Sequence, residues 1–312
     1  MALNDSFLKE MQDKVASFEL TAEEQDSGVV LESADGIAHI SGLSSAVMGE
    51  MLEFPDGISG RVFNLEREEI LCAILDKHTK VREGAWVKRS GNVMGVAVGP
   101  ELLGRIINPL GAPLDGKGPI RTEKVFPLER PSPGIMDRQP VTVPLQTGYK
   151  VVDSLVPIGR GQRELIIGDR QTGKTTLALD TIINQQDSGV LTVYVAIGQK
   201  EATVVKQMHK LKDLGLLKNV VIVMASASAP AILQYLSPYV GCAIAEYFMY
   251  EQHRDTLVIY DDLSKHATAY RHISLLMRRP PGREAYPGDI STCIRACSSG
   301  RPGCPTRWAA AR

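Results

Sequence analysis

Residues 168–175, with the sequence GDRQTGKT, limit the folds open to this chain more than any other stretch. They match the pattern G-x-x-x-x-G-K-[ST], in which glycines let backbone N–H groups turn towards phosphate oxygens at the start of a helix. In such a loop the lysine reaches the outer phosphates and the final hydroxyl ligates magnesium, roles that fall to Lys174 and Thr175. The pattern therefore predicts nucleotide binding through Gly168, Asp169, Arg170, Gln171, Thr172, Gly173, Lys174, Thr175 and Thr176.

The residues on either side of the loop support this interpretation. Residues 164–167 form a short apolar stretch that predicts a buried strand, and apolar residues recur at helical spacing in 176–183. A chance match to the four fixed positions is expected in about one chain of this length in a hundred, because average glycine usage is only about 7%. The strand–loop–helix context makes coincidence rarer still, so we favour a functional loop.

A second motif follows a later strand. Residues 257–260 are apolar and lead into Asp261 and Asp262. At such a position Asp261 is expected to hold magnesium through water, because this ion keeps much of its hydration shell in proteins. The alternative is a strand that ends in a solvated Asp-Asp turn, and the upstream loop favours the magnesium role.

Strands and helices alternate through this part of the chain. Such alternation predicts a mainly parallel sheet with helices on both faces. The expected strands span residues 164–167, 191–197, 220–225 and 256–260, and the expected helices begin at 173 and span about 202–214 and 229–251.

The preceding residues have a different pattern. Residues 1–24 carry apolar side chains three or four positions apart and predict an amphipathic helix, either a frayed terminal helix or one that binds a partner. Residues 25–88 contain short β-rich runs between turn signals, which predict a small closed β-barrel. Residues 89–289 begin with a stretch rich in glycine and proline and continue into the nucleotide-binding domain, so the fold class is α/β with an N-terminal barrel.

Composition excludes several function classes. The formal net charge of -1 gives no electrostatic reason to expect nucleic acid as a partner. The N-terminus has neither the apolar core of a signal peptide nor the composition of a transit peptide. The longest uncharged run, residues 225–245, contains prolines and serines and is a poor membrane span. We expect a protein without a membrane-spanning segment, in which Cys72 and Cys242 are reduced core residues.

Several motifs together resemble one family, the alpha subunits of F-type ATP synthases. The similarity extends from about residue 25 to Asp289, and the family has an N-terminal β-barrel, a RecA-like nucleotide-binding domain and a C-terminal helical bundle. The segments that carry the resemblance are 145–148, 153–175, 195–200, 260–265 and 278–289.

The resemblance implies a role in a larger assembly. Alpha subunits alternate with beta subunits in a hexamer, contact the central-shaft gamma subunit and the stalk delta subunit, and bind ATP or ADP with Mg²⁺. The complex makes ATP from ADP and phosphate by using a transmembrane ion gradient, or hydrolyses ATP in reverse. By this resemblance we expect a peripheral location on the cytoplasmic side of a bacterial cell membrane.

The same resemblance implies that this subunit is not catalytic. Beta subunits have an alanine- and glycine-rich phosphate loop, whereas Asp169, Arg170 and Gln171 stand here, and Gln199 occupies the position of the catalytic glutamate of beta. An amide cannot act as a general base at neutral pH. Taken without the family, Gln199 is an ordinary residue at the start of a helix.

The resemblance stops after Asp289. The tail, residues 290–312, contains Cys293, Cys297 and Cys304. We do not expect a zinc site there, because no fourth cysteine or histidine lies nearby at the spacing of zinc ligands. If the codons from Ile290 onward are read in a shifted frame, the degeneracy of the genetic code permits an amino-acid sequence that looks like the family's continuation. Our hypothesis is therefore that the tail is translated out of frame. The nucleotide-binding domain is then incomplete, and the helical bundle and the arginine that reaches the neighbouring beta site are missing.

Two other interpretations stay open at the sequence level. A self-sufficient RecA-like ATPase motor is opposed by Gln199 and by the lack of a basic, aromatic nucleic-acid surface. A non-functional gene fragment is the third interpretation.

Overall fold

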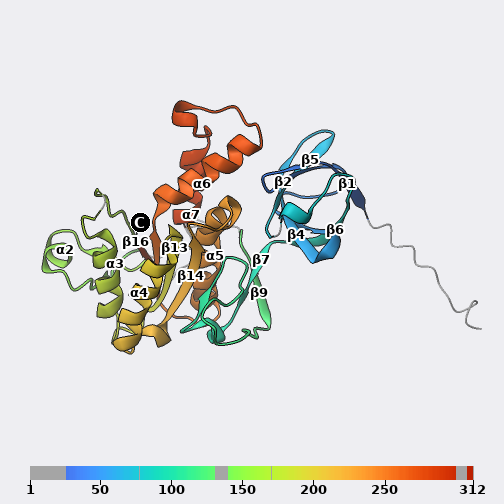
Figure 1. Ribbon diagram of the computed structural model, residues 1–312. Helices are drawn as coiled ribbons and strands as arrows, with labels where there is room; N and C mark the ends of the chain where they lie inside the picture. Colours follow the sequence, from blue (N-terminus) through green and yellow to red (C-terminus); the bar gives the residue numbers. More distant parts are fainter. Residues whose placement is uncertain (1–25, 77, 131–139, 170, 300–307, 312) are drawn as a thin grey trace, which may run out of the picture.

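The computed structural model describes residues 26–76, 78–130, 140–169, 171–299 and 308–311. Figure 1 shows a β-barrel beside a larger α/β domain. This arrangement confirms the predicted fold class. The helix predicted for residues 1–24 lies outside the described residues, and none of the described helices is long and apolar enough to cross a membrane.

The barrel is closed and has six antiparallel strands. Their order around the barrel is β1-β2-β5-β4-β3-β6, and the last strand extends beyond the boundary that we predicted at residue 88. Alternate side chains fill the interior, among them Ile40, Leu52 and Val87. The strands are β1 (Ser27–Ala34), β2 (Ile37–Gly42), β3 (Glu50–Phe54), β4 (Ile58–Leu65), β5 (Glu69–Ile74) and β6 (Trp86–Val93).

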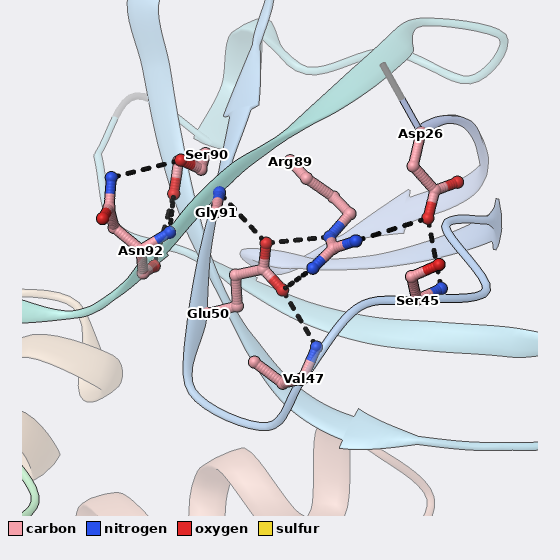
Figure 2. Close-up of polar contacts among 8 residues, drawn as sticks. All are labelled: Asp26, Ser45, Val47, Glu50, Arg89, Ser90, Gly91 and Asn92. Atoms are coloured by element: carbon pink, nitrogen blue, oxygen red, sulfur yellow. Dashed lines mark hydrogen bonds and ion pairs between the residues drawn. The ribbon is translucent and has the colours of Figure 1, made fainter. Parts of the chain in front are cut away.

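A buried ion pair joins β3 to β6 (Figure 2). Glu50 is 1% exposed, and its carboxylate accepts hydrogen bonds from Arg89 Nε at 2.9 Å and Nη2 at 3.1 Å. The backbone N–H groups of Val47 and Gly91 donate to the same carboxylate at 2.9 and 3.1 Å. Arg89 also lies 3.6 Å from Asp26, which precedes β1. The cluster therefore ties three segments together where the barrel closes.

These contacts decide the charge of Glu50. Burial alone would raise the pKa of its carboxyl group, because a charge is poorly solvated inside the barrel. The hydrogen bonds and positive charge of Arg89, with the N–H groups of Val47 and Gly91, outweigh burial and hold the pKa below its usual value. Glu50 is consequently ionised in the folded barrel at neutral pH.

The larger domain contains a six-stranded parallel sheet in the order β12-β16-β15-β13-β14-β8. Its strands are β8 (Ile106–Ile107), β12 (Arg163–Glu164), β13 (Leu191–Gln199), β14 (Val220–Ser226), β15 (Thr256–Asp261) and β16 (Trp308–Ala311). Two-stranded sheets pair β7 (Gly95–Val98) with β9 (Lys124–Pro127) and β10 (Pro144–Leu145) with β11 (Ile158–Gly159).

Helices cover both faces of the parallel sheet, as predicted (Figure 1). One face of β13 packs in an apolar cluster with α3 and α4, and the other face packs with α5 and α6. The central strands are apolar on both faces, which is typical of a parallel sheet between two helical layers. The helices are α2 (Lys150–Leu155), α3 (Lys174–Asn184), α4 (Glu201–Asp213), α5 (Ala231–Tyr250), α6 (Leu263–Leu276) and α7 (Ile290–Ser299).

The barrel and the nucleotide-binding domain share a hydrophobic core. Phe63 and Leu71 of the barrel belong to the same buried cluster as Tyr235 of α5 and Ile273 of α6. The rings of Phe63 and Tyr235 lie 5.4 Å apart at 59°, a favourable tilted arrangement. This shared core fixes the barrel against the helices on one face of the sheet.

The predicted buried strand over residues 164–167 is wrong. Strand β12 contains only Arg163 and Glu164, and the side chains of Leu165 and Ile167 are 53% and 83% exposed. The reason is position, because among the described strands β12 lies at the edge of the sheet and pairs with β16 alone. An apolar stretch does not by itself determine burial, because burial also depends on the elements that pack around the segment.

Two elements lie in the segment that we expected to be an aberrant tail. Helix α7 contains Cys293, which is 9% exposed, and β16 pairs with β15 and β12. Cys72 is a buried, reduced thiol, as expected, whereas Cys242 is a reduced thiol that is only partly buried.

We predict that Glu50→Gln lowers the free energy of unfolding by about 2 kcal/mol at pH 7, because it weakens hydrogen bonds to a charged group. The Glu50 pKa is lowered in the folded protein, so its stabilisation is present above the unfolded pKa and is lost as pH falls through the folded one. The difference from wild type should therefore shrink below about pH 4. Urea unfolding at a series of pH values measures this.

Glu53→Gln is the matched control, because Glu53 lies on the same strand with an exposed side chain. Equal effects of the two substitutions, or a difference that does not depend on pH, would contradict the role assigned to Glu50.

Candidate nucleotide-binding site

The predicted loop lies beside a pocket of about 550 Å³ at the carboxyl end of the parallel sheet. In open α/β sheets, ligands bind at this end of the strands. Three segments line the pocket, namely the loop with the start of α3, the end of β15, and the first turns of α6. The lining residues are Leu165, Ile166, Ile167, Gly168, Asp169, Lys174, Thr175, Ala178, Ile259, Tyr260, Asp261, Asp262, Leu263, Ser264, Lys265 and Thr268.

The loop needs glycine at two positions. Gly173 has φ +92°, a left-handed conformation that side chains disfavour. At Gly168 a Cβ atom would meet Thr172 Oγ1 at 2.7 Å, and this hydroxyl donates to the carbonyl of Asp169 at 2.8 Å. Gln171 also has a positive φ, +64°. Arg170 lies outside the described residues.

Helix α3 presents its N-terminus to the pocket. The helix begins at Lys174, and no side chain caps it at Gly173. The first N–H groups of a helix lack partners within the helix and carry the positive end of its dipole, so they favour an anion. This is the arrangement with which phosphate-binding loops hold phosphate.

The Lys174 ammonium group lies over the loop. Its Nζ donates to the carbonyl of Gly168 at 2.5 Å and also to the carbonyl of Asp169. A lysine ammonium group has three hydrogens, and these two backbone acceptors hold the cation at the mouth of the loop. A phosphate oxygen in the pocket would offer Lys174 a stronger, charged acceptor.

Thr175 and Asp261 meet across the pocket, as the two motifs require. Thr175 Oγ1 at the start of α3 donates to Asp261 Oδ2 at the end of β15, with 2.8 Å between the atoms. Tyr194 of β13 donates its hydroxyl to the same Oδ2, also at 2.8 Å. Sequence reasoning found Thr175 and Asp261 but missed Tyr194.

Tyr194 remains protonated in this environment. Its side chain is 2% exposed, and burial followed by the negative charge of Asp261 raises the pKa of the phenol above its usual value. A polar-tipped aromatic residue within an otherwise apolar strand was the available signal, since a buried tyrosine hydroxyl usually finds a hydrogen-bond partner.

Gln199 lies at the end of β13, beside the same aspartate. Its Nε2 donates to the backbone carbonyl of Asp261 at 3.1 Å, and the residue is 8% exposed. The neighbouring Gly198 has φ +58°, and the pairing of β13 with β14 shifts register there. The amide thus supports the backbone of the β15 terminus.

The first turn of α6 completes the pocket. Asp262 caps the helix, because its Oδ1 accepts from the backbone N–H of Lys265 at 2.9 Å. The Lys265 ammonium group lies 3.6 Å from Asp262 Oδ2 and adds a second cation to the pocket lining. Lys265 was not among the predicted site residues, although it belongs to the segment 260–265 that carries the family resemblance.

Comparison with known proteins identifies both domains. Residues 24–91 match the beta-barrel domain of the ATP synthase alpha/beta family, and residues 148–298 match the nucleotide-binding domain of the same family.

The chain is similar to two curated proteins named ATP synthase subunit alpha. It is 57% identical over 280 residues to that of Caldanaerobacter subterraneus subsp. tengcongensis, which covers 90% of this chain and 55% of the relative. It is 56% identical over 265 residues to that of Acetivibrio thermocellus, which covers 85% of this chain and 52% of the relative. The chain thus spans about half the length of these curated relatives.

We predict that Gly173→Ala weakens the binding of inorganic pyrophosphate and lowers stability by about 1 kcal/mol, because alanine disfavours the left-handed conformation. Titration calorimetry and thermal unfolding measure the two effects. Gly215→Ala is the matched control, since Gly215 has φ +70° and open space around it but lies outside the pocket. The control should lose similar stability and keep its pyrophosphate affinity, and an equal loss of affinity in both variants would contradict the role of the loop.

Proposed function

Because the chain belongs to the ATP synthase alpha/beta family, we propose that it forms the barrel and nucleotide-binding domain of an alpha subunit of a rotary ATP synthase. In this proposal it binds ATP or ADP together with Mg²⁺ and does not hydrolyse the nucleotide. The observation that carries the proposal is the 2.8 Å contact between Thr175 of the loop and Asp261 of β15 at the edge of the pocket.

The residues present fit a magnesium–phosphate group. Mg²⁺ prefers hard oxygen ligands and keeps several waters while it binds one or two protein groups and substrate phosphates. Thr175 Oγ1 and Asp261 would supply such oxygens to a bound ion. Bound there, the cation would neutralise phosphate charge, while Lys174 and the α3 N-terminus would hold the outer phosphates.

Gln199 supports the absence of hydrolysis. General-base catalysis of the attack of water on a phosphate needs a group that accepts the proton of the water, and a neutral amide is not a base at pH 7. Here the Gln199 Nε2 is engaged with the Asp261 carbonyl. Nucleotide bound at this site is therefore expected to persist, which suits a regulatory or structural site.

The proposed activity of the whole assembly rests on the names of the relatives, and its partners rest on the family resemblance of the sequence. We propose that the chain acts within a complex that makes ATP from ADP and phosphate by using a transmembrane ion gradient, or runs in reverse. Its partners would be alternating beta subunits, the central-shaft gamma subunit and the stalk delta subunit, with the complex peripheral to the cytoplasmic side of a bacterial membrane. The relatives favour this proposal over a self-sufficient RecA-like motor.

The direct test is ATP binding by the full chain in the presence of Mg²⁺. We expect Lys174→Ala to weaken binding by about 10- to 100-fold, because a hydrogen bond to a charged group contributes about 1.5–3 kcal/mol. Lys218→Ala is the control, since Lys218 is exposed and lies in a 3-10 turn that precedes β14, at the opposite end of the sheet.

Chromatography of the bound nucleotide tests the second half of the proposal. We expect ATP to be recovered intact after incubation with the wild-type chain. Formation of ADP that disappears in Lys174→Ala would show that the site is catalytic, and equal ATP affinity of Lys174→Ala and wild type would contradict nucleotide binding through the loop.

A further inference from the structure

One oxygen of Asp261 accepts two hydrogen bonds from different parts of the domain. Thr175 Oγ1 and the Tyr194 hydroxyl both donate to Oδ2, each at 2.8 Å. Among the described residues, hydrogen bonds to the Asp261 side chain reach only this oxygen. The other oxygen, Oδ1, is therefore the one available to the hydration shell of a bound cation.

The Tyr194 hydroxyl has another neighbour besides Asp261, namely Gln207 of α4. The distance from the hydroxyl to Gln207 Oε1 is 3.2 Å, longer than the 2.8 Å to Asp261. A phenol has one hydrogen, so it can donate to only one of the two acceptors. The shorter, charge-assisted bond to the carboxylate takes this hydrogen. Rotation of the Gln207 amide then lets its NH₂ group donate to the phenol oxygen.

We infer that Tyr194 is a positioning residue for Asp261, one that holds Oδ2 in place and so directs Oδ1 to the water shell of the magnesium ion. This inference rests on the proposed function. Tyr194 is suited to the role because its ring lies in the buried cluster between the sheet and helices α3 and α4. A buried ring restricts the hydroxyl to one position, whereas Thr175 would also serve as a metal ligand.

Gln207 extends this support to the surface of the domain. It lies on α4, whose residues Val204 and Leu211 pack against the same buried cluster. Groups that hydrogen-bond to metal ligands fix the ligand's orientation, and their loss typically costs about 10- to 100-fold in metal affinity. The effect of losing Gln207 should be smaller, since the Tyr194 ring stays packed without it.

The test compares Tyr194→Phe with wild type in the full chain. ATP affinity is measured with Mg²⁺ and again with EDTA. The affinity with Mg²⁺ divided by the affinity with EDTA, the metal ratio, gives the contribution of the metal. We expect this ratio to fall about tenfold in Tyr194→Phe, with affinity in EDTA unchanged. Electron paramagnetic resonance of Mn²⁺ in the presence of ATP gives a second readout. The affinity for Mn²⁺ should fall by a similar factor in Tyr194→Phe.

Tyr247→Phe is the matched control. Tyr247 is 5% exposed, lies on α5, and accepts a hydrogen bond from Gln252 Nε2 at 3.2 Å, so the substitution also removes a bonded hydroxyl from a buried ring. Its metal ratio should equal that of wild type. Gln207→Ala is a second test variant, at a partly exposed position. We expect the metal ratio to fall about two- to fivefold in this variant, because it loses one weak hydrogen bond.

The outcomes separate this inference from the proposed function. If wild type binds ATP with Mg²⁺ and Tyr194→Phe keeps the same metal ratio, the inference is overturned while the proposed function stands. A loss that is equal with Mg²⁺ and with EDTA also overturns it, because Tyr194 would then shape the pocket only. If wild type binds no ATP, or binds it without any effect of Mg²⁺, the proposed function fails and the inference fails with it.

Discussion

The hydrogen bond between Thr175 and Asp261 is the link on which the site depends. Strand β12, which leads into the loop, has two residues and pairs with one strand within the described parts of the chain, so the sheet ladder alone holds the loop weakly. The side-chain contact at 2.8 Å joins the start of α3 directly to the end of β15, a strand that pairs with β13 along six residues. Apolar contacts between α3 and the sheet also hold the helix in place, in addition to this hydrogen bond. The two motifs therefore stabilise each other's geometry even before any ligand is considered.

The two domains each contain a carboxylate whose hydrogen-bond partners differ. In the barrel, the buried carboxylate of Glu50 has all its neighbours supplied by the protein, in Arg89 and two backbone N–H groups. In the pocket, Asp261 has one oxygen held by the protein and the other left for a ligand. The same chemical group thus helps to close a barrel in one place, and in the other it is the group that we propose to face a magnesium ion. The difference lies in how completely the surroundings satisfy it.

Much of the fold could be predicted from the sequence, since local patterns determine it. The loop at 168–175, the acidic end of β15 and the alternation of strands and helices follow from residue type and spacing, and the barrel follows from short runs between turns. The exposure of Leu165 and Ile167 could not be predicted, because burial depends on the elements that pack around a segment. Local sequence patterns indicate which residues can form a strand, but they do not indicate which elements will pack beside that strand.

The site was predicted less completely than the fold. Lys174, Thr175 and Asp261 belong to motifs, whereas Tyr194, Gln207 and Lys265 enter the site through tertiary packing. A tyrosine in an apolar strand reads as a core residue, and here it is both a core residue and a hydrogen-bond donor. The roles expected for Arg170 and for the helix at residues 1–24 stay predictions, because these residues lie outside the described parts of the chain.

The most direct test of the central claim is a double-mutant cycle between Thr175 and Asp261, read out as Mg²⁺-dependent ATP affinity. If the two residues form one magnesium site, Thr175→Val and Asp261→Asn should each remove most of the metal's contribution, and the double variant should lose little more. Losses that simply add in the double variant would show that the residues act independently, and would contradict the single site proposed here.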